Sequence, residues 1–439
     1  MKRKLLLVLA ASMLLGGCGV EFAPQSSEAS QTQTTGQEDP AKGNSKTNEE
    51  DPSVYEPVEL KPADPPVIPD EVKVPTDKYE KAAFFADYMA KENPGNSLAS
   101  PISLEIALGL AAQGASGETL EEIKAYLGKE NYADWVAEYM EFAKNCKSEK
   151  NDRYSFAYEI ANSMWFQEGL QLKKDFQNTA DQKFGAQAEN LDFINATAQA
   201  VKTINTWIEE KTHDMIKNAL DTSDINADTR AVLVNTLYFE SPWAEDWGLK
   251  EHEFTTISGE KKNQEMLVDY DLSRYYENEY CTAFAKSYYN GFQFIGILPK
   301  KEGDFNVSDL DLKGLMETGT NEYEVHAIAP KMDFESESKE VVQMLVDQGV
   351  QKPFFGDTAS FDQMIENDNF FISKIIQKCK IKLDEKGTQA AAATIIEMDE
   401  ACAMEEPKEV KEVFLDRPFA FMIYDSRNDE IAFIGKVVE

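Results

Sequence analysis

Residues 384–407 read DEKGTQAAAATIIEMDEACAMEEP, and this stretch decides the fold. It follows a strand-like run and leads into another, yet it is too apolar for a solvated turn. Every second residue from position 388 lies on one uncharged face: Thr388, Ala390, Ala392, Thr394, Ile396 and Met398. The acidic residues Glu397 and Asp399 lie on the other face, which is the alternation of a half-buried strand. A segment with the position of a loop and the pattern of a strand is a candidate for changing between the two.

The sequence around this segment predicts one large domain over residues 76–439, because no linker and no repeat interrupts it. Its first elements are helical. Residues 77–90 have helical apolar spacing, and Ser100-Pro101 reads as a cap and first-turn proline for a helix over 102–112. Thr119–Glu122 reads as a capping box for a helix that ends at Gly128.

Strands dominate the later sequence. Residues 230–239 are nearly all apolar, as expected of a strand covered on both faces. Asn290-Gly291 predicts a hairpin with a two-residue loop. Further strands are expected over 371–384, 413–424 and 431–438. Early helices followed by several long strands predict an α+β fold.

The N-terminus has the pattern of an exported lipoprotein. A basic start precedes an apolar run over 5–15 that is too short to span a bilayer, and Leu15-Gly16-Gly17-Cys18 resembles a bacterial lipobox. We therefore expect residues 1–17 to be a signal peptide and Cys18 to carry lipid; a secretory signal with a chance cysteine is the alternative. Residues 18–75 are rich in Pro, Ser and Thr, which predicts a disordered tether.

These features predict an extracytoplasmic protein held on a bacterial membrane by its lipid, with shedding or secretion as the alternative. The formal net charge of −35 over 439 residues opposes nucleic-acid binding and favours a basic or neutral partner, although solubility explains such acidity equally well. Cys146, Cys281, Cys379 and Cys402 have neither zinc-site nor disulfide-scaffold spacing, so free thiols are expected. No HExxH or GxSxG occurs, so we expect no catalytic residue, metal or cofactor.

Five motifs together resemble the serpin family, over the chain from about residue 77 to the end. In chain order they are NSLASPIS at 96–103, INTW at 204–207, LVNTLYF at 233–239, EKGTQAAAAT at 385–394 and FLDRPF at 414–419. The resemblance implies the serpin fold: early helices on a large mixed central sheet, smaller additional sheets, and an exposed reactive-centre loop at about 385–412.

The resemblance also implies a mechanism. A protease attacks the loop, and the loop then enters the central sheet as a new strand, hinged at its start. The implied hinge residues are Glu385, Gly387, Thr388, Ala390, Ala391, Ala392, Ala393 and Thr394. The segment from Thr388 to Thr394 contains neither charge nor proline, which would oppose entry between packed strands.

The reactive bond is placed by the family's usual distance from the hinge, which gives Ala401–Cys402. The uncharged face breaks at Glu400, which independently favours a bond nearby. The loop is longer than in typical serpins, so Ala403 and Met404 remain alternatives. Alanine before the bond favours elastase-like proteases.

Two further clusters follow from the resemblance. Ser100, Ser103 and Asn235 correspond to the polar shutter beneath the opening strands, with Gln377 in place of the usual histidine. Trp243, Lys331 and Glu385 correspond to the breach where the hinge enters, the last two as an ion pair. Simple core packing or a weak surface pair is the alternative reading of each cluster.

The sequence thus predicts a monomeric, non-enzymatic inhibitor that traps an elastase-like serine protease as a covalent acyl complex. A non-inhibitory serpin is one alternative, although such members usually have charge, proline or bulk in the hinge. An extracytoplasmic solute-binding lipoprotein is the other, but it would need two lobes of repeating βαβ units, which the sequence lacks.

Overall fold

The computed structural model describes residues 60–61, 64–75, 77–148, 155–366, 370–388 and 408–439. Several sequence predictions fall outside these residues, namely the lipid site Cys18, the hinge positions from Ala390 to Thr394, and the reactive-bond candidates Ala401, Cys402, Ala403 and Met404. In the described part of the chain, no helix has both the length and the apolarity needed to cross a membrane.

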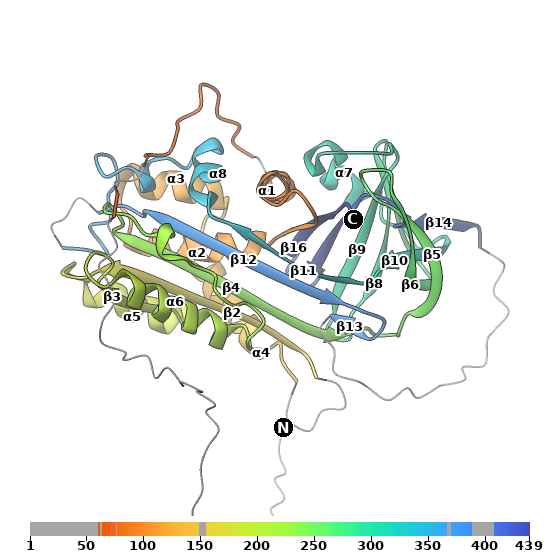
Figure 1. Ribbon diagram of the computed structural model, residues 1–439, viewed down its shortest axis with the longest axis horizontal. Coiled ribbons are helices and arrows are strands. Elements are labelled where there is room, and N and C mark those ends of the chain that lie inside the picture. Colours follow the sequence, from red (N-terminus) through yellow and green to blue (C-terminus); the bar gives the residue numbers. More distant parts are fainter. Residues whose placement is uncertain (1–59, 62–63, 76, 149–154, 367–369, 389–407) are drawn as a thin grey trace, which may run out of the picture. The chain divides into compact units, whose positions relative to one another are not determined.

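The described residues form three sheets. The central sheet has the strand order β11-β12-β13-β4-β2-β3. Its strands are β11 (Met332–Ser338), β12 (Lys374–Leu383), β13 (Gly387–Thr388), β4 (Ala231–Pro242), β2 (Ala157–Gln167) and β3 (Gln187–Leu191). β12 and β4 are long neighbours, and the short β13 lies between them at one end (Figure 1).

The other two sheets are built mostly from later strands. The second sheet contains β1 (Ser97–Ala99), β16 (Glu430–Val437), β15 (Phe419–Asp425), β9 (Phe292–Pro299), β8 (Cys281–Ser287) and β7 (Arg274–Glu277). The third contains β14 (Val410–Phe414), β10 (Glu324–Pro330), β6 (Lys261–Leu272) and β5 (Gly248–Thr255). The central and third sheets are mixed, because they contain the parallel pairs β2–β3 and β10–β14, whereas every pairing in the second sheet is antiparallel.

Helices precede and cover these sheets. The early helices are α1 (Lys78–Glu92), α2 (Pro101–Gly114), α3 (Gly117–Leu127), α4 (Tyr132–Asn145) and α5 (Lys174–Phe184). Later helices are α6 (Thr197–Lys211), α7 (Leu312–Glu317) and α8 (Val341–Asp347). The early helices pack into one main core with the sheets, whereas α6 covers the opposite face of the central sheet. The predicted α+β architecture is confirmed.

The position of β4 in the central sheet explains why its sequence is almost continuously apolar. Leu233 and Phe239 point into the main core, whereas Val232 and Val234 pack with Trp207 of α6 in a second, smaller cluster. Both faces of the strand are therefore covered, as predicted.

The prediction of a capping box at Thr119–Glu122 was wrong. α3 begins at Gly117 with Ser116 at its N-cap, so Thr119 lies inside the helix. The Thr119 hydroxyl is buried and accepts a hydrogen bond from the backbone of Ser360 at 2.9 Å. The Thr119 side chain, which the motif assigned to capping, instead makes a long-range contact with Ser360. Gly128 does end the helix, in the left-handed conformation, as predicted.

Two strand predictions also need correction. The hairpin at Asn290-Gly291 exists, but the amide of Tyr288 bonds to Phe292 and Gly291 has a φ of 84°, which makes a three-residue loop with one left-handed glycine. The single strand expected over 413–424 is two strands in different sheets, β14 and β15. Pro418 separates them, because proline cannot donate to a ladder.

Candidate functional site at the hinge

β13 is a two-residue strand inserted between β12 and β4. Thr388 pairs with Leu383 on one side and with Ser241 on the other, and both pairings are antiparallel. Gly387 packs so closely against β4 that a Cβ atom there would lie 2.3 Å from the Ser241 carbonyl oxygen. Only glycine allows this approach, so the sequence of the hinge is matched to its place between the strands.

The Thr388 side chain is already buried. It is 2 % exposed, and its hydroxyl lies 2.7 Å from the hydroxyl of Tyr288. The Tyr288 ring stacks on Trp243, with ring centroids 4.1 Å apart and an interplanar angle of 14°. Burial raises the pKa of Tyr288, so its hydroxyl stays protonated and available as a donor. Thr388, the first residue of the uncharged face, is therefore already buried in the sheet and hydrogen-bonded.

The segment that follows β4 holds the backbone just before β13. Trp243 donates from its amide to the Lys386 carbonyl at 3.0 Å and from its indole to the Asp384 carbonyl at 2.9 Å. The amide of Trp247 donates to the Glu385 carbonyl at 3.1 Å. Three consecutive carbonyls are thus bound, which fixes the direction in which the chain enters the sheet.

Ion pairs surround the same point. The ammonium of Lys331 lies 3.0 Å from a carboxylate oxygen of Glu385 and 2.8 Å from one of Glu265. The hydrogen bond from Lys331 lowers the pKa of Glu385, and the bond to Glu265 is the main cause that raises the pKa of Lys331. Lys386 pairs with Asp246 at 2.6 Å. These side chains are partly exposed, so each pair contributes about 1 kcal/mol or less.

The far end of the contact between β12 and β4 is closed. There the two strands pair directly and in parallel, with Ile375 beside Leu233 and Ile376 beside Val234. The buried carboxylate of Asp224 lies 3.1 Å from the ammonium groups of both Lys374 and Lys339. We call the direct pairing over Lys374–Ile376 the closed end, and β13 with its contacts the open end.

The predicted shutter residues are buried near the middle of this contact, but they form two separate pairs. Gln377 makes two hydrogen bonds to the backbone of Ser100, at 2.8 and 2.9 Å. Asn235 instead donates to Asn162, a residue that the sequence prediction missed. Ser103 is buried on α2. The Oδ1 atom of Asn235 is buried without a hydrogen-bond partner among the residues that the structure describes.

The structure thus brings Trp243, Lys331 and Glu385 together with Gly387 and Thr388, and the expected ion pair is present. Sequence reasoning missed Tyr288, Trp247 and Asn162, each of which contacts a predicted residue or its backbone. Within the described ranges no group of His, Cys, Asp and Glu side chains is arranged to hold a metal ion. Cys146, Cys281 and Cys379 are buried free thiols, as expected for these three.

Residues 82–439 match the model of the Serpin family, which is described as a family of serine protease inhibitors. The chain is 28% identical over 355 residues to an uncharacterised serpin-like protein of Thermococcus kodakarensis, covering 79% of this chain and 81% of that protein. It is 27% identical over 357 residues to the leukocyte elastase inhibitor of Xenopus tropicalis, covering 78% and 92%.

Among solved structures, the native state of the thermophilic serpin tengpin is 28% identical, with a TM-score of 0.69 and coverage of 84% of this chain and 96% of that one. Serpin48 of the insect Tenebrio molitor is 26% identical, with a TM-score of 0.69 and coverage of 82% and 96%. The fold and the site define a protein with three sheets, in which the two residues of β13 are already paired with β12 and β4 of the central sheet. The chain belongs to the serpin family.

Proposed function

We propose that this serpin is a suicide inhibitor of serine proteases that works by loop insertion. A protease serine attacks the scissile carbonyl of the loop, the peptide bond breaks, and the new amine leaves as an acyl ester forms. The freed loop then enters the central sheet between β12 and β4. The bound protease is carried along and distorted before water can cleave the ester.

The observation that carries this proposal is β13 itself. Thr388 already pairs with both strands that the loop would separate, and its hydroxyl is satisfied there. The native hinge is therefore a strand that has begun to form, so insertion extends an existing ladder. This step avoids the cost of starting a new pairing.

The register of β13 defines the rest of the path. Extending the two antiparallel pairings sets Thr394 between Gln377 and Asn235, where its hydroxyl reaches the level of the unpartnered Asn235 oxygen. The same extension sets Ile396 between Ile375 and Leu233, which now pair directly. Insertion to this depth therefore requires the closed end to open.

The chemistry of the hinge favours inhibition over the non-inhibitory alternative. Thr388, Ala390, Ala392 and Thr394 are small and uncharged, so each fits beside strands that are already packed. A charged or bulky side chain at any of them would slow insertion and let the ester hydrolyse.

We propose an elastase-like target and cleavage at Ala401–Cys402, with Ala403 and Met404 as alternatives. The similarity to the leukocyte elastase inhibitor of Xenopus tropicalis supports the protease class. Mass spectrometry of the peptide released on acylation tests the position. A new N-terminus at Cys402 agrees with the proposal, and one before Met398 would rule it out.

We further propose that lipid on Cys18 anchors the protein outside the cytoplasm of a bacterial cell. The lipobox-like sequence and the basic, apolar start support this location. Cys18→Ala should move the protein from the membrane to the soluble fraction and leave inhibition unchanged. Retention of the variant on membranes would contradict lipid anchoring.

The test of function is a denaturing gel of the protein mixed with elastase. An inhibitor gives a covalent band at the sum of the two masses, and elastase with its active-site serine blocked gives none. Cleavage without such a band would favour a non-inhibitory serpin. No reaction with any member of a serine protease panel would favour a binding role such as solute capture.

A further inference from the structure

A segment before α1 crosses the closed end. It consists of residues 60–61 and 64–75, which we call the strap (Figure 1). The Lys61 carbonyl accepts a hydrogen bond from the Ala227 amide at 3.1 Å. The Val67 amide donates to the Gln343 side chain at 2.8 Å, and the same side chain donates to the Val67 carbonyl at 2.7 Å. The sequence predicted these strap residues as the last part of a tether.

The points that the strap contacts belong to opposite sides of the seam between β12 and β4. Ala227 lies in the loop that leads directly into β4. Gln343 lies in α8, which packs against β12. A hollow of about 540 Å³ lies between, lined by Pro66 and Val67 of the strap and by Lys374 at the start of β12. The strap therefore bridges the two halves that must separate when the closed end opens.

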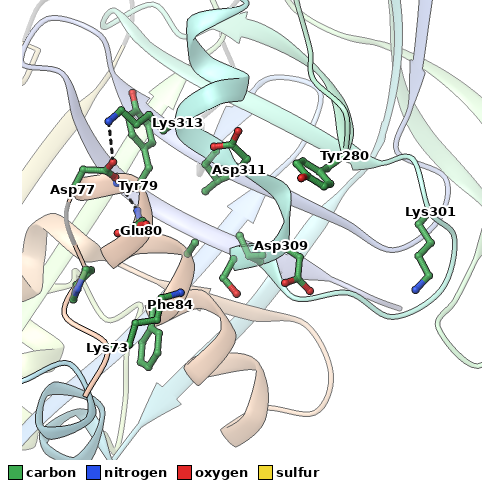
Figure 2. A pocket seen from close by; sticks show the side chains of 15 residues that line it. Lys73, Asp77, Tyr79, Glu80, Phe84, Tyr280, Lys301, Asp309, Asp311 and Lys313 are labelled. Carbon is green, nitrogen blue, oxygen red and sulfur yellow. Dashed lines mark hydrogen bonds and ion pairs between the residues drawn. The ribbon is translucent and has the colours of Figure 1, made fainter. Parts of the chain in front are cut away.

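The later part of the strap is also fixed to the body. A Cβ atom at Gly349, just after α8, would lie 3.0 Å from the Val74 side chain, which shows how closely the two segments pack. Lys73 lines a second hollow, of about 670 Å³, at the start of α1 (Figure 2). There Asp77 caps α1 and lies 3.4 Å from the ammonium of Lys313 of α7. The strap is thus held at both ends.

We propose that the strap is a latch on the closed end, which keeps β12 paired with β4 until the loop inserts. The proposal rests on the proposed function for its purpose, but the latch itself is a property of the uncleaved protein. The latch would regulate the separation of β12 from β4 at the end of the seam that lies opposite the hinge. A protein whose strap is released opens this end more often.

The latch is weak enough to release. The Val67 side chain is 72 % exposed and the strap bonds to Gln343 face solvent, so water competes for them. Loss of both bonds should raise opening of the closed end by about 5-fold. The buried contacts of Asp224 with Lys374 and Lys339 remain and keep the opening limited.

The test uses the full uncleaved chain with two substitutions. Gln343→Met removes both strap bonds at similar side-chain volume, together with the bond from Gln343 to Asp347. Val67→Pro removes only the amide donor, so it leaves the Asp347 bond intact. Gln177→Met, at an exposed position of α5 away from the strap, is the matched control.

Two measurements decide the outcome. Trypsin cleavage after Lys73 reports release of the strap. Hydrogen exchange of the Ser373 amide, which donates to the Ala231 carbonyl of β4 at 3.2 Å beside this pairing, reports opening of the closed end. We expect both to rise about 5-fold in Gln343→Met and less in Val67→Pro, with no change in the control.

The latch is overturned if cleavage after Lys73 rises while exchange of the Ser373 amide stays at the wild-type rate. It is also overturned if neither changes, or if the control changes as much as the variants. Exchange is measured without any protease target. A protein that shows the exchange shift but never traps a protease would therefore refute the proposed function and leave the latch standing.

Discussion

The open and closed ends of the seam between β12 and β4 are built in opposite ways. At the open end β13 already separates the strands, and its threonine is buried and hydrogen-bonded. At the closed end Ile375 pairs directly with Leu233, beside an ion cluster and the strap. The two strands are therefore already separated at one end and directly paired at the other. Under the proposed mechanism, the hinge would start insertion and the closed end would limit how far insertion proceeds before cleavage.

The largest expected effect comes from placing a charge at the open end. Thr388→Arg puts a guanidinium where the side chain is 2 % exposed, and an unpaired buried charge costs several kcal/mol. We expect the loop still to be cut, while formation of the covalent complex falls about 100-fold or more. The gel with elastase measures both.

Gln389→Arg is the matched control, because the alternation puts position 389 on the opposite, outward face. It should trap protease nearly as well as the wild type. Equal trapping by Thr388→Arg and Gln389→Arg would contradict insertion through β13.

A smaller effect is expected midway along the seam. Thr394→Val removes the hydroxyl that the register sets beside the unpartnered oxygen of Asn235. A buried oxygen left unsatisfied should lower the ratio of trapped to cleaved inhibitor by about 5-fold. Titration of elastase gives this ratio, and Thr394→Ser should restore it. If valine performs as well as serine, the proposed register is wrong.

The two ends of the seam and its middle differ in how much of their structure could be predicted from the sequence. The start of the hinge was predictable because its chemistry is local: the glycine at 387 and the alternation that begins at Thr388 are visible in one stretch. The hinge positions from Ala390 to Thr394 lie outside the described residues. Tyr288, Trp247 and Asn162 were missed because each acts through a partner more than seventy residues away, and nothing in its own neighbourhood marks it. Thr119 misled for the same reason, since its hydroxyl serves Ser360 and not the helix start.

Stability should report the hydrogen bond at the open end. Tyr288→Phe keeps the stacking on Trp243 but leaves the buried Thr388 hydroxyl without this partner. We expect the free energy of unfolding to fall by about 1 kcal/mol, measured by denaturant titration. Tyr280→Phe, at an exposed tyrosine, is the control and should change little. An equal loss in both variants would argue against a specific role of the bond.

The smallest effect is a pH dependence of the ion pair at the hinge. Lys331 lowers the pKa of Glu385 below its ordinary value of 4.5, so the pair contributes fully above that value and is lost as the pH falls through the lowered pKa. The difference in unfolding free energy between wild type and Glu385→Gln should therefore be present at about pH 6 and shrink as the pH falls below 4.5 and through the lowered pKa. A difference that is constant with pH would show that the carboxylate charge does not matter.

The most direct test of loop insertion is a structure of the protein after cleavage of its loop. We predict that residues 388–398 form a strand antiparallel to both β12 and β4, with Thr394 beside Asn235 and Ile396 between Ile375 and Leu233. The direct pairing of Ile375 with Leu233 should be gone. A cleaved protein in which that pairing persists and β13 still ends at Thr388 would contradict the account.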